Sequence, residues 1–504
     1  MYDIRTDRDH DNDHLYLCLV IFTGVMIGKR SKKSAEGFYL GGRGMGPLVT
    51  AMSAEASDMS SYLLMGIPGL AYLSGVADAS WTAIGLAIGT YLNFLLVARR
   101  LRRYSVELDA ITIPSFISKR YGEKKPIIMG IASLIILVFF VPYVASGLAA
   151  IGKLFNSLFG WNYMLSVIVG AIVIISYTSV GGFSAVATMD LIQSVIMTVA
   201  LCVIVVFGIV QAGGMDAVLA HAGSLPGFLS FGQTYNAASG QAEPYGLIRI
   251  VSMLAWGLGY FGMPHIIIRF MSLKSQKEMK KSAVIAISWT ALICFFATMV
   301  GVVGRMYLGM DENINQNSLV FIAMVRSIFP ALMSGILLSG VLAASMSTAS
   351  SQLLASASAF ASDVYKPVIR KYQSGDKEML WAGRIVVLVI SFVALLIADS
   401  PRAGSIMELV ANAWGVFGAA FGSAIMLSLF WRGFTFQGAV ACIIVGAVVD
   451  IGWYLTMAAS TGIYEIIPGF FASLVAGVIV SLLSGGPSKD VAALYDKANN
   501  YVED

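Results

Sequence analysis

The chain is a succession of long apolar segments separated by short polar ones. Of its 504 residues 57% are hydrophobic and only 12% are charged, whereas soluble domains carry about 25% charged residues. A helix needs about 20 mostly apolar residues to cross a bilayer. Within lipid, the backbone polar groups must be satisfied inside helices or closed barrels. The sequence therefore predicts an all-α, multi-pass membrane protein.

Read segment by segment, the sequence contains about thirteen candidate spans. They cover residues 15–28, 47–73, 80–97, 127–154, 164–177, 185–210, 246–270, 283–307, 319–360, 382–398, 406–429, 438–457 and 467–483. The ninth exceeds the length that a bilayer requires, so we expect it to include an extracellular approach helix.

Basic residues mark alternate loops. They lie at 29–43, 99–125, 274–281 and 366–377, whereas residues 211–245 contain no Lys or Arg. Because basic loops are retained in the cytoplasm, this alternation predicts an extracellular N-terminus and a cytoplasmic C-terminus.

Two of the predicted spans contain helix-breaking residues. In the second, Glu55 and Asp58 precede Gly66 and Pro68, and in the seventh three glycines precede Pro264. Such interruptions free backbone carbonyls that a bound ion or solute can satisfy. The two spans are five apart and so run in opposite directions. Matched breaks of this kind favour a transporter with inverted repeats over ordinary proline kinks.

The ninth span, GILLSGVLAASMSTASSQLLASASAF, is dense in small and hydroxylated residues. Close helix packing explains many such stretches. Hydroxyls at Ser347 and Thr348, together with carbonyls of the broken second span, would also suit sodium, a hard cation that favours oxygen ligands. Both interpretations stay open at this point.

Other classes of function find less support in the sequence. The four cysteines lie in apolar runs and form no CxxC pair, and the four histidines show no metal-binding spacing. A net charge of +4 does not indicate the basic surface that nucleic-acid-binding proteins carry. We therefore expect neither an enzyme nor a nucleic-acid partner, and no obligatory protein partner.

Four segments resemble the sodium/solute symporter family, specifically its sodium/proline branch. They are YLGGRGMGPLVTAMSAEASDMSS, SVGGFSAVATMDLIQS, WGLGYFGMPHIIIRFM and LAASMSTASSQL. The resemblance implies symport of L-proline with sodium ions across a bacterial cytoplasmic membrane by alternating access. It also implies a leucine-transporter-like fold with two inverted five-helix repeats. The chain departs from the family pattern at Glu55, Ser61, Tyr62 and Met263.

This fold divides the chain into six parts. They are an extracellular N-terminus, first span and cytoplasmic loop (1–45), a first repeat (46–211), an extracellular loop (212–245), a second repeat (246–432), two C-terminal spans (433–485) and a cytoplasmic tail (486–504).

The resemblance also implies the binding residues. Sodium would be bound by Ala56, Met59, Ala344, Ser347 and Thr348. Proline would be bound by Tyr143, Trp256, Tyr260, Pro264 and Gly66, because aromatic side chains suit its ring and helix ends suit its charged head. Asp58, Ser60 and Asp190 are candidates for coupling. The alternatives are a sodium symporter for another small solute and a proton-coupled carrier of the same fold, with Asp58 and Glu55 as proton sites.

Overall fold

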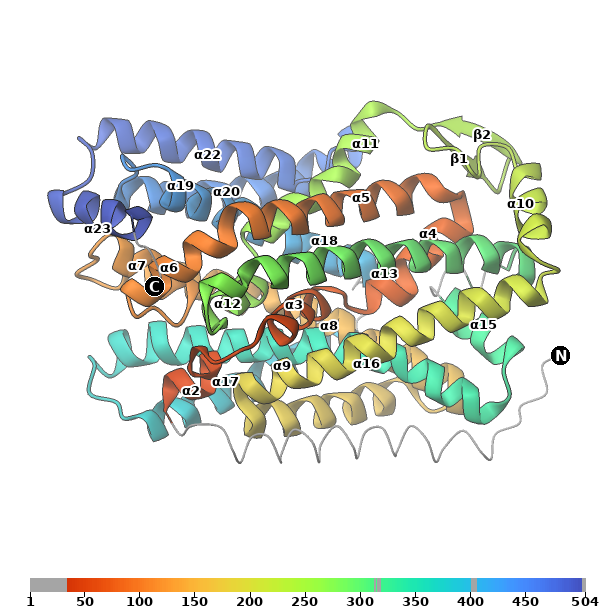
Figure 1. Ribbon diagram of the computed structural model, residues 1–504, viewed down its shortest axis with the longest axis horizontal. Helices are drawn as coiled ribbons and strands as arrows, with labels where there is room; N and C mark the ends of the chain where they lie inside the picture. The colour runs from red at the N-terminus through yellow and green to blue at the C-terminus, as the bar shows by residue number, and fades with distance from the viewer. Residues whose placement is uncertain (1–33, 312–313, 315–318, 400–405, 501–504) are drawn as a thin grey trace.

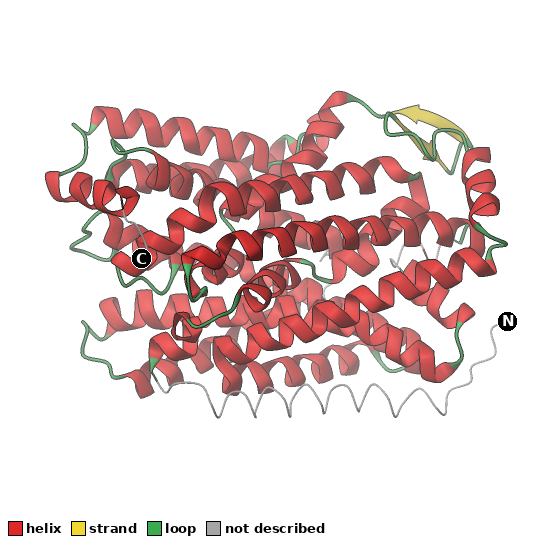
Figure 2. Ribbon diagram, in the orientation of Figure 1, coloured by secondary structure: helices red, strands yellow, loops and turns green. Residues whose placement is uncertain are grey.

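The computed structural model describes residues 34–311, 314, 319–399 and 406–500. Its long helices run side by side along one axis of the molecule (Figure 1), and one small β-hairpin is the only sheet in the described part of the chain (Figure 2). The predicted first span, 15–28, lies outside the described residues.

The first half of the chain forms helices up to the extracellular loop. They are α2 (Ala35–Leu40), η1 (Gly41–Arg43), α3 (Pro47–Asp58), η2 (Tyr62–Gly66), α4 (Ile67–Ser74), α5 (Val76–Leu92), η3 (Asn93–Ala98), α6 (Arg99–Glu107), α7 (Ile113–Arg120), α8 (Ile127–Phe159), α9 (Tyr163–Gln211) and α10 (Met215–Ser224).

The second half begins with the hairpin. The elements are β1 (Gln233–Asn236), β2 (Gln241–Pro244), α11 (Leu247–Leu254), η4 (Ala255–Phe261), α12 (Pro264–Ser272), η5 (Gln276–Glu278), α13 (Met279–Leu308), α15 (Val320–Ile328), α16 (Ala331–Ala359), η6 (Phe360–Ile369), α17 (Asp376–Ala398), α18 (Ile406–Phe417), η7 (Gly418–Gly422), α19 (Ser423–Phe430), α20 (Phe436–Thr456), α21 (Ala458–Thr461), α22 (Ile466–Leu483) and α23 (Lys489–Asn500).

Within the described residues, nine helical stretches are long and apolar enough to cross a membrane. The segments Leu247–Phe261 and Pro264–Ser272 form a further span that is bent by 45°. Large apolar side chains cover the outside of these helices, with Leu396 58% exposed, Val448 64% and Leu482 67%. Monomeric soluble proteins rarely expose such continuous apolar surface, so these side chains face lipid.

Helix α9 contains two of the predicted spans. A straight helix of its 49 residues would be about 74 Å long, more than twice the hydrocarbon thickness. Gly182 interrupts it with φ 61° and ψ −169°, torsions that glycine adopts readily. Two helices therefore meet at this glycine, which separates the predicted spans 164–177 and 185–210.

Helix α16 lies in the interior, where it packs against α3, α8, α9 and α17. Its residues from Leu337 to Ala359 are buried throughout. Small side chains let its neighbours approach, since a Cβ on Gly340 would lie 2.9 Å from the Cβ of Ala200. The predicted ninth span is thus two helices, because α15 ends before Pro330 and α16 begins after it.

The two ends of the molecule differ. Helix α10 and the β-hairpin cover one end, and helix α23 lies at the other with α6 and α7 (Figure 1). The predicted polar tail is therefore largely helical. Its Lys497 pairs with Glu107 at the end of α6, and its Asp496 accepts from Arg432 at 2.8 Å.

Candidate substrate and sodium site

The second predicted span is interrupted directly after Asp58. Helix α3 ends there, Met59 leaves the helical region with φ −68° and ψ 75°, and the chain resumes as the π-helical turn η2. The Ser60 amide donates to the carbonyl of Asp58 at 2.7 Å. The break therefore places the predicted site residue Asp58 at the last position of α3, and Met59 and Ser60 on non-regular backbone in the interior.

The seventh predicted span changes geometry over its glycines. It narrows to the 3₁₀ segment η4, and Pro264 then starts α12 at the first helical position, where proline is favoured. A Cβ on Gly259 would lie 1.9 Å from Nε1 of Trp414, and one on Gly89 would lie 2.5 Å from Cα of Gly257. The glycines thus allow η4 to pack closely against α5 and α18.

The predicted sodium ligands converge where α16 meets the end of α3. The Ser347 hydroxyl lies 2.8 Å from the carbonyl oxygen of Ala56 and 3.1 Å from that of Ala344. Thr348 Oγ1 is buried and has no hydrogen-bond partner among the described residues. The structure therefore brings Ala56, Ala344 and Ser347 together, with an unsatisfied hydroxyl one residue further along α16.

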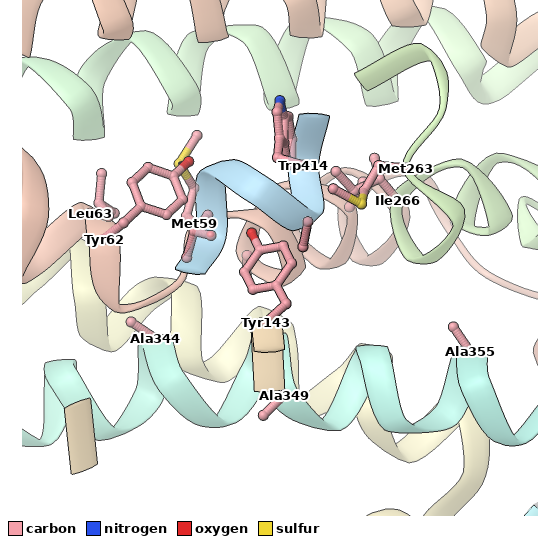
Figure 3. Close-up of a cluster of buried hydrophobic side chains, with 14 of the residues drawn as sticks. Met59, Tyr62, Leu63, Tyr143, Met263, Ile266, Ala344, Ala349, Ala355 and Trp414 are labelled. Carbon is pink, nitrogen blue, oxygen red and sulfur yellow. The ribbon is translucent and has the colours of Figure 1, made fainter. Parts of the chain in front are cut away.

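Met59 lies at the same break, and its side chain turns toward the neighbouring turn η2. The Tyr62 hydroxyl donates to Met59 Sδ at 3.2 Å, and the two side chains lie side by side in the interior (Figure 3). Met59 therefore contributes its backbone, rather than its side chain, to any oxygen site at the break.

An aromatic cluster adjoins the break. The Tyr260 hydroxyl donates to Oδ2 of Asp58, and that of Tyr62 lies 3.5 Å from the same oxygen. The Trp256 ring lies 6.1 Å from that of Tyr62 and 6.2 Å from that of Trp414. The Trp414 indole N–H also donates to the Trp256 carbonyl at 2.7 Å. Trp256 and Tyr260 thus share one buried cluster with the break.

The other three predicted substrate residues lie around this cluster. Tyr143 points from α8 toward the ribbon that carries Trp414 (Figure 3), and its ring stands at 85° to that of His265, beside Pro264. Gly66 faces a different neighbour, since a Cβ there would lie 3.3 Å from Sδ of Met407. The same Cβ would lie 3.4 Å from Cβ of Tyr62, whose ring belongs to the cluster.

Asp190 lies away from this cluster, in a polar network that joins four helices. Its Oδ2 accepts from Ser53 at 2.6 Å and forms an ion pair with Arg269 at 3.2 Å. Arg269 also donates to Ser53 at 3.0 Å and to Ser351 at 2.5 Å. These residues lie on α3, α9, α12 and α16, so Asp190 has a buried cationic partner that the sequence analysis missed.

Glu55 is the other buried carboxylate of α3. Its Oε2 accepts hydrogen bonds from Thr290 of α13 at 2.8 Å and from Thr90 of α5 at 3.1 Å. The side chain therefore points between α5 and α13, away from Ser347.

One sequence signal could have found more of this site. Arg269 is a basic residue inside an apolar segment, and such residues usually mark a functional pathway or a buried partner. Trp414 carried no comparable signal, because aromatic residues are common in spans. Chemically, the arrangement combines backbone and hydroxyl oxygens suited to a hard cation with aromatic surfaces suited to a compact apolar ring.

The chain is similar to known proteins over most of its length. The model of the sodium:solute symporter family matches residues 38–446. The chain is 41% identical to the osmoregulated proline transporter OpuE of Bacillus subtilis, with 94% of each chain covered. It is 39% identical to the sodium/proline symporter of Escherichia coli, covering 96% of this chain and 95% of the relative.

Solved structures share the fold at low sequence identity. A Na⁺-coupled sialic acid symporter in a substrate-bound, outward-open state has a TM-score of 0.76 at 19% identity, covering 95% of this chain and 99% of the other. MhsT in complex with L-phenylalanine has a TM-score of 0.52 at 16% identity, covering 86% and 98%. These neighbours confirm a leucine-transporter-like fold. The chain belongs to the sodium:solute symporter family.

Proposed function

We propose that this protein imports L-proline by symport with sodium ions through alternating access. The observation that carries the proposal is the contact of Ser347 with the Ala56 carbonyl, because it lies within the same interruption as the Asp58–Tyr260 hydrogen bond. An oxygen site and an aromatic cluster therefore share one break in α3. The names of the relatives, which are proline transporters, support proline as the solute.

Sodium is proposed to bind the carbonyls of Ala56, Met59 and Ala344 and the hydroxyls of Ser347 and Thr348. The Ser347 hydroxyl, which has one hydrogen to donate, lies within hydrogen-bond distance of the Ala56 and Ala344 carbonyls. On binding a cation, its hydroxyl would turn its lone pairs inward and the carbonyls would coordinate the ion. The unsatisfied Thr348 hydroxyl would then gain a partner, because an unpaired buried hydroxyl is costly.

Proline is proposed to lie among Trp256, Tyr260 and Tyr143. The aromatic faces would contact the ring, and the N-terminus of α12 at Pro264 would meet the carboxylate, since helix N-termini favour anions. Gly66 is proposed to leave room where η2 passes α18. Asp58 and Ser60 would then respond to both ligands, because they lie between the two sites.

The proposed topology has about thirteen spans, with two inverted five-helix repeats over 46–211 and 246–432 and two further spans over 433–485. Basic segments of α6 and α7 lie at the same end as α23 (Figure 1). This supports a cytoplasmic position for that end. The end bearing α10 and the hairpin would face outward. Asp190, the third coupling candidate, is proposed to act between the site and the cytoplasm.

The direct test is uptake of radiolabelled proline into proteoliposomes, with and without an inward sodium gradient. We expect uptake with the sodium gradient and little with a proton gradient alone. Uptake driven equally well by a proton gradient would identify the proton-coupled alternative. Failure of excess unlabelled proline to compete, together with competition by another solute, would identify a different substrate.

Two variants test the sites separately. Trp256→Ala should raise the proline concentration for half-maximal uptake more than the sodium concentration, and Ser347→Ala should show the opposite bias. Because linkage between binding sites is reciprocal, each value will also move somewhat in the other variant. Equal shifts of both values in both variants would contradict the assignment of separate sites.

A further inference from the structure

One wall of the aromatic cluster comes from outside both proposed repeats. Tyr464 lies in the connection between α21 and α22 and is only 8% exposed. Its ring lies 5.5 Å from that of Trp256, at an angle of 31°. The rings of Tyr62 and Trp414 lie farther from Trp256, at 6.1 and 6.2 Å. Within the described part of the chain, the C-terminal spans therefore supply the ring nearest to Trp256.

The side chain of Trp256 depends on these ring contacts for its orientation. Its carbonyl accepts from Trp414, but its indole makes no side-chain hydrogen bond to any described residue. Aromatic rings with centroids about 4.5–7 Å apart stabilise one another beyond the area that they bury. Loss of the nearest ring would therefore allow the indole to adopt other rotamers.

Tyr464 is itself held on two sides. Its hydroxyl donates to the carbonyl of Ala411 in α18 at 2.8 Å. Its amide donates to the hydroxyl of Ser252 in α11 at 3.2 Å, and that hydroxyl donates to the carbonyl of Gly462 at 3.1 Å. Because both its backbone and its hydroxyl are anchored, the ring has little freedom to turn away. It forms a fixed surface against Trp256.

The start of α22 is packed closely behind Tyr464. A Cβ on Gly418 of η7 would lie 2.5 Å from Cδ1 of Ile466. A Cβ on Gly415 of α18 would lie 3.0 Å from Oδ2 of Asp450 and 3.3 Å from Cγ of Glu465. The segment that carries Tyr464 is thus fixed against α18 and η7, since little space is left between them.

We propose that Tyr464 is a positioning residue for solute binding, whose ring holds the indole of Trp256 in the orientation that contacts the solute. The inference rests on the proposed function, and it gives the C-terminal spans a part in recognising the solute. Because Tyr464 acts through Trp256, its loss should weaken binding of the solute more than binding of sodium.

Sodium-driven uptake of radiolabelled proline, measured over ranges of proline and sodium concentration, tests this role. Tyr464→Leu removes the ring and should raise the proline concentration for half-maximal uptake about fivefold to tenfold. Tyr464→Phe keeps the ring and should stay close to the natural protein. The control is Tyr454→Leu, which removes a tyrosine of α20 whose hydroxyl donates to Glu408 at 3.0 Å, outside the cluster. This control should keep the natural values.

If Tyr464→Leu gives no folded protein, Tyr464→Met replaces it, because methionine lacks the ring and adapts to irregular space. A double variant then asks whether Tyr464 acts through Trp256. In the Trp256→Ala background, Tyr464→Leu should have little further effect on the proline value, because the ring that it orients is gone. Residues that act through one contact are not additive in this way.

Four results would overturn the inference. They are an unchanged proline value in Tyr464→Leu, an equal loss in Tyr464→Phe, an equal rise of the proline and sodium values, and full additivity with Trp256→Ala. In each case sodium-driven proline uptake by the natural protein still stands. Absence of that uptake in the natural protein would instead contradict the proposed function.

Discussion

The ion pair between Asp190 and Arg269 allows a quantitative test of how the interior is held together. At 3.2 Å and an effective dielectric constant of about 20, the Coulomb attraction between the two charges is about 5 kcal/mol. Removing one partner leaves the other charge buried, which typically costs about 3–5 kcal/mol. We therefore expect Asp190→Asn to lower the free energy of unfolding by an amount in that range.

The two partners should not be equivalent. Arg269 cannot lose its proton, so Asp190→Asn leaves a permanent buried charge. In Arg269→Met, the remaining carboxylate can take up a proton or a cation and keeps the Ser53 hydrogen bond, so the cost should be smaller. The double variant Asp190→Leu/Arg269→Met removes both charges, and it should be more stable than Asp190→Asn.

Unfolding by SDS titration in detergent micelles, followed by tryptophan fluorescence, measures these differences. The exposed pair Arg432–Asp496, with side chains 59% and 46% exposed, provides the control. Asp496→Asn should change stability far less than Asp190→Asn, because water and salt screen an exposed pair. If the double variant is no more stable than Asp190→Asn, the two charges do not compensate each other and the reasoning fails.

Three further variants test the site. Thr348→Val keeps the shape of a buried side chain and removes an unsatisfied hydroxyl. We expect the sodium concentration for half-maximal uptake to rise about tenfold or more, while folding is unchanged. An unchanged sodium requirement would remove Thr348 from the site. Asp58→Asn should abolish most uptake through weaker sodium binding, and normal uptake at low sodium would make Asp58 structural. Gly259→Ala would place a Cβ 1.9 Å from Nε1 of Trp414, so the yield of folded protein should fall sharply. The control is Gly246→Ala, whose added Cβ meets no atom within 4 Å, and this variant should behave as the natural protein.

Most of the fold could be predicted from the sequence, because the thickness of the bilayer sets a minimum length for each membrane-spanning helix. Apolar runs of sufficient length located most spans, and the turn at Gly182 separates two of the predicted ones. The breaks were also readable, because clusters of glycine and proline recur in two predicted spans that are five apart. The docking of α23 against α6 was not readable, because it depends on surface pairs such as Lys497 with Glu107 that are nearly four hundred residues apart.

The site could be predicted only in part from the sequence, for a related reason. Motifs named residues on α3, η4 and α16, and the structure places Ser347 against Ala56. Motifs did not give the partners supplied by distant helices. Arg269 was visible as a charge within an apolar run, but nothing in its neighbourhood identified Asp190 as its partner. Trp414 is one apolar residue among many in α18 until its indole is seen to donate to the Trp256 carbonyl.

Three residues of α3 contact three different parts of the interior, two of which we propose as the sodium and solute sites. Ser53 donates to Asp190 at 2.6 Å, and the Ala56 carbonyl accepts from Ser347 at 2.8 Å. Asp58 accepts from Tyr260 of the aromatic cluster. These contacts lie within six consecutive residues, and the helix ends at the last of them. We therefore expect a ligand that displaces the end of α3 to alter the other two contacts as well. Because coupling between binding sites is reciprocal, sodium and solute should each strengthen the binding of the other through this short segment.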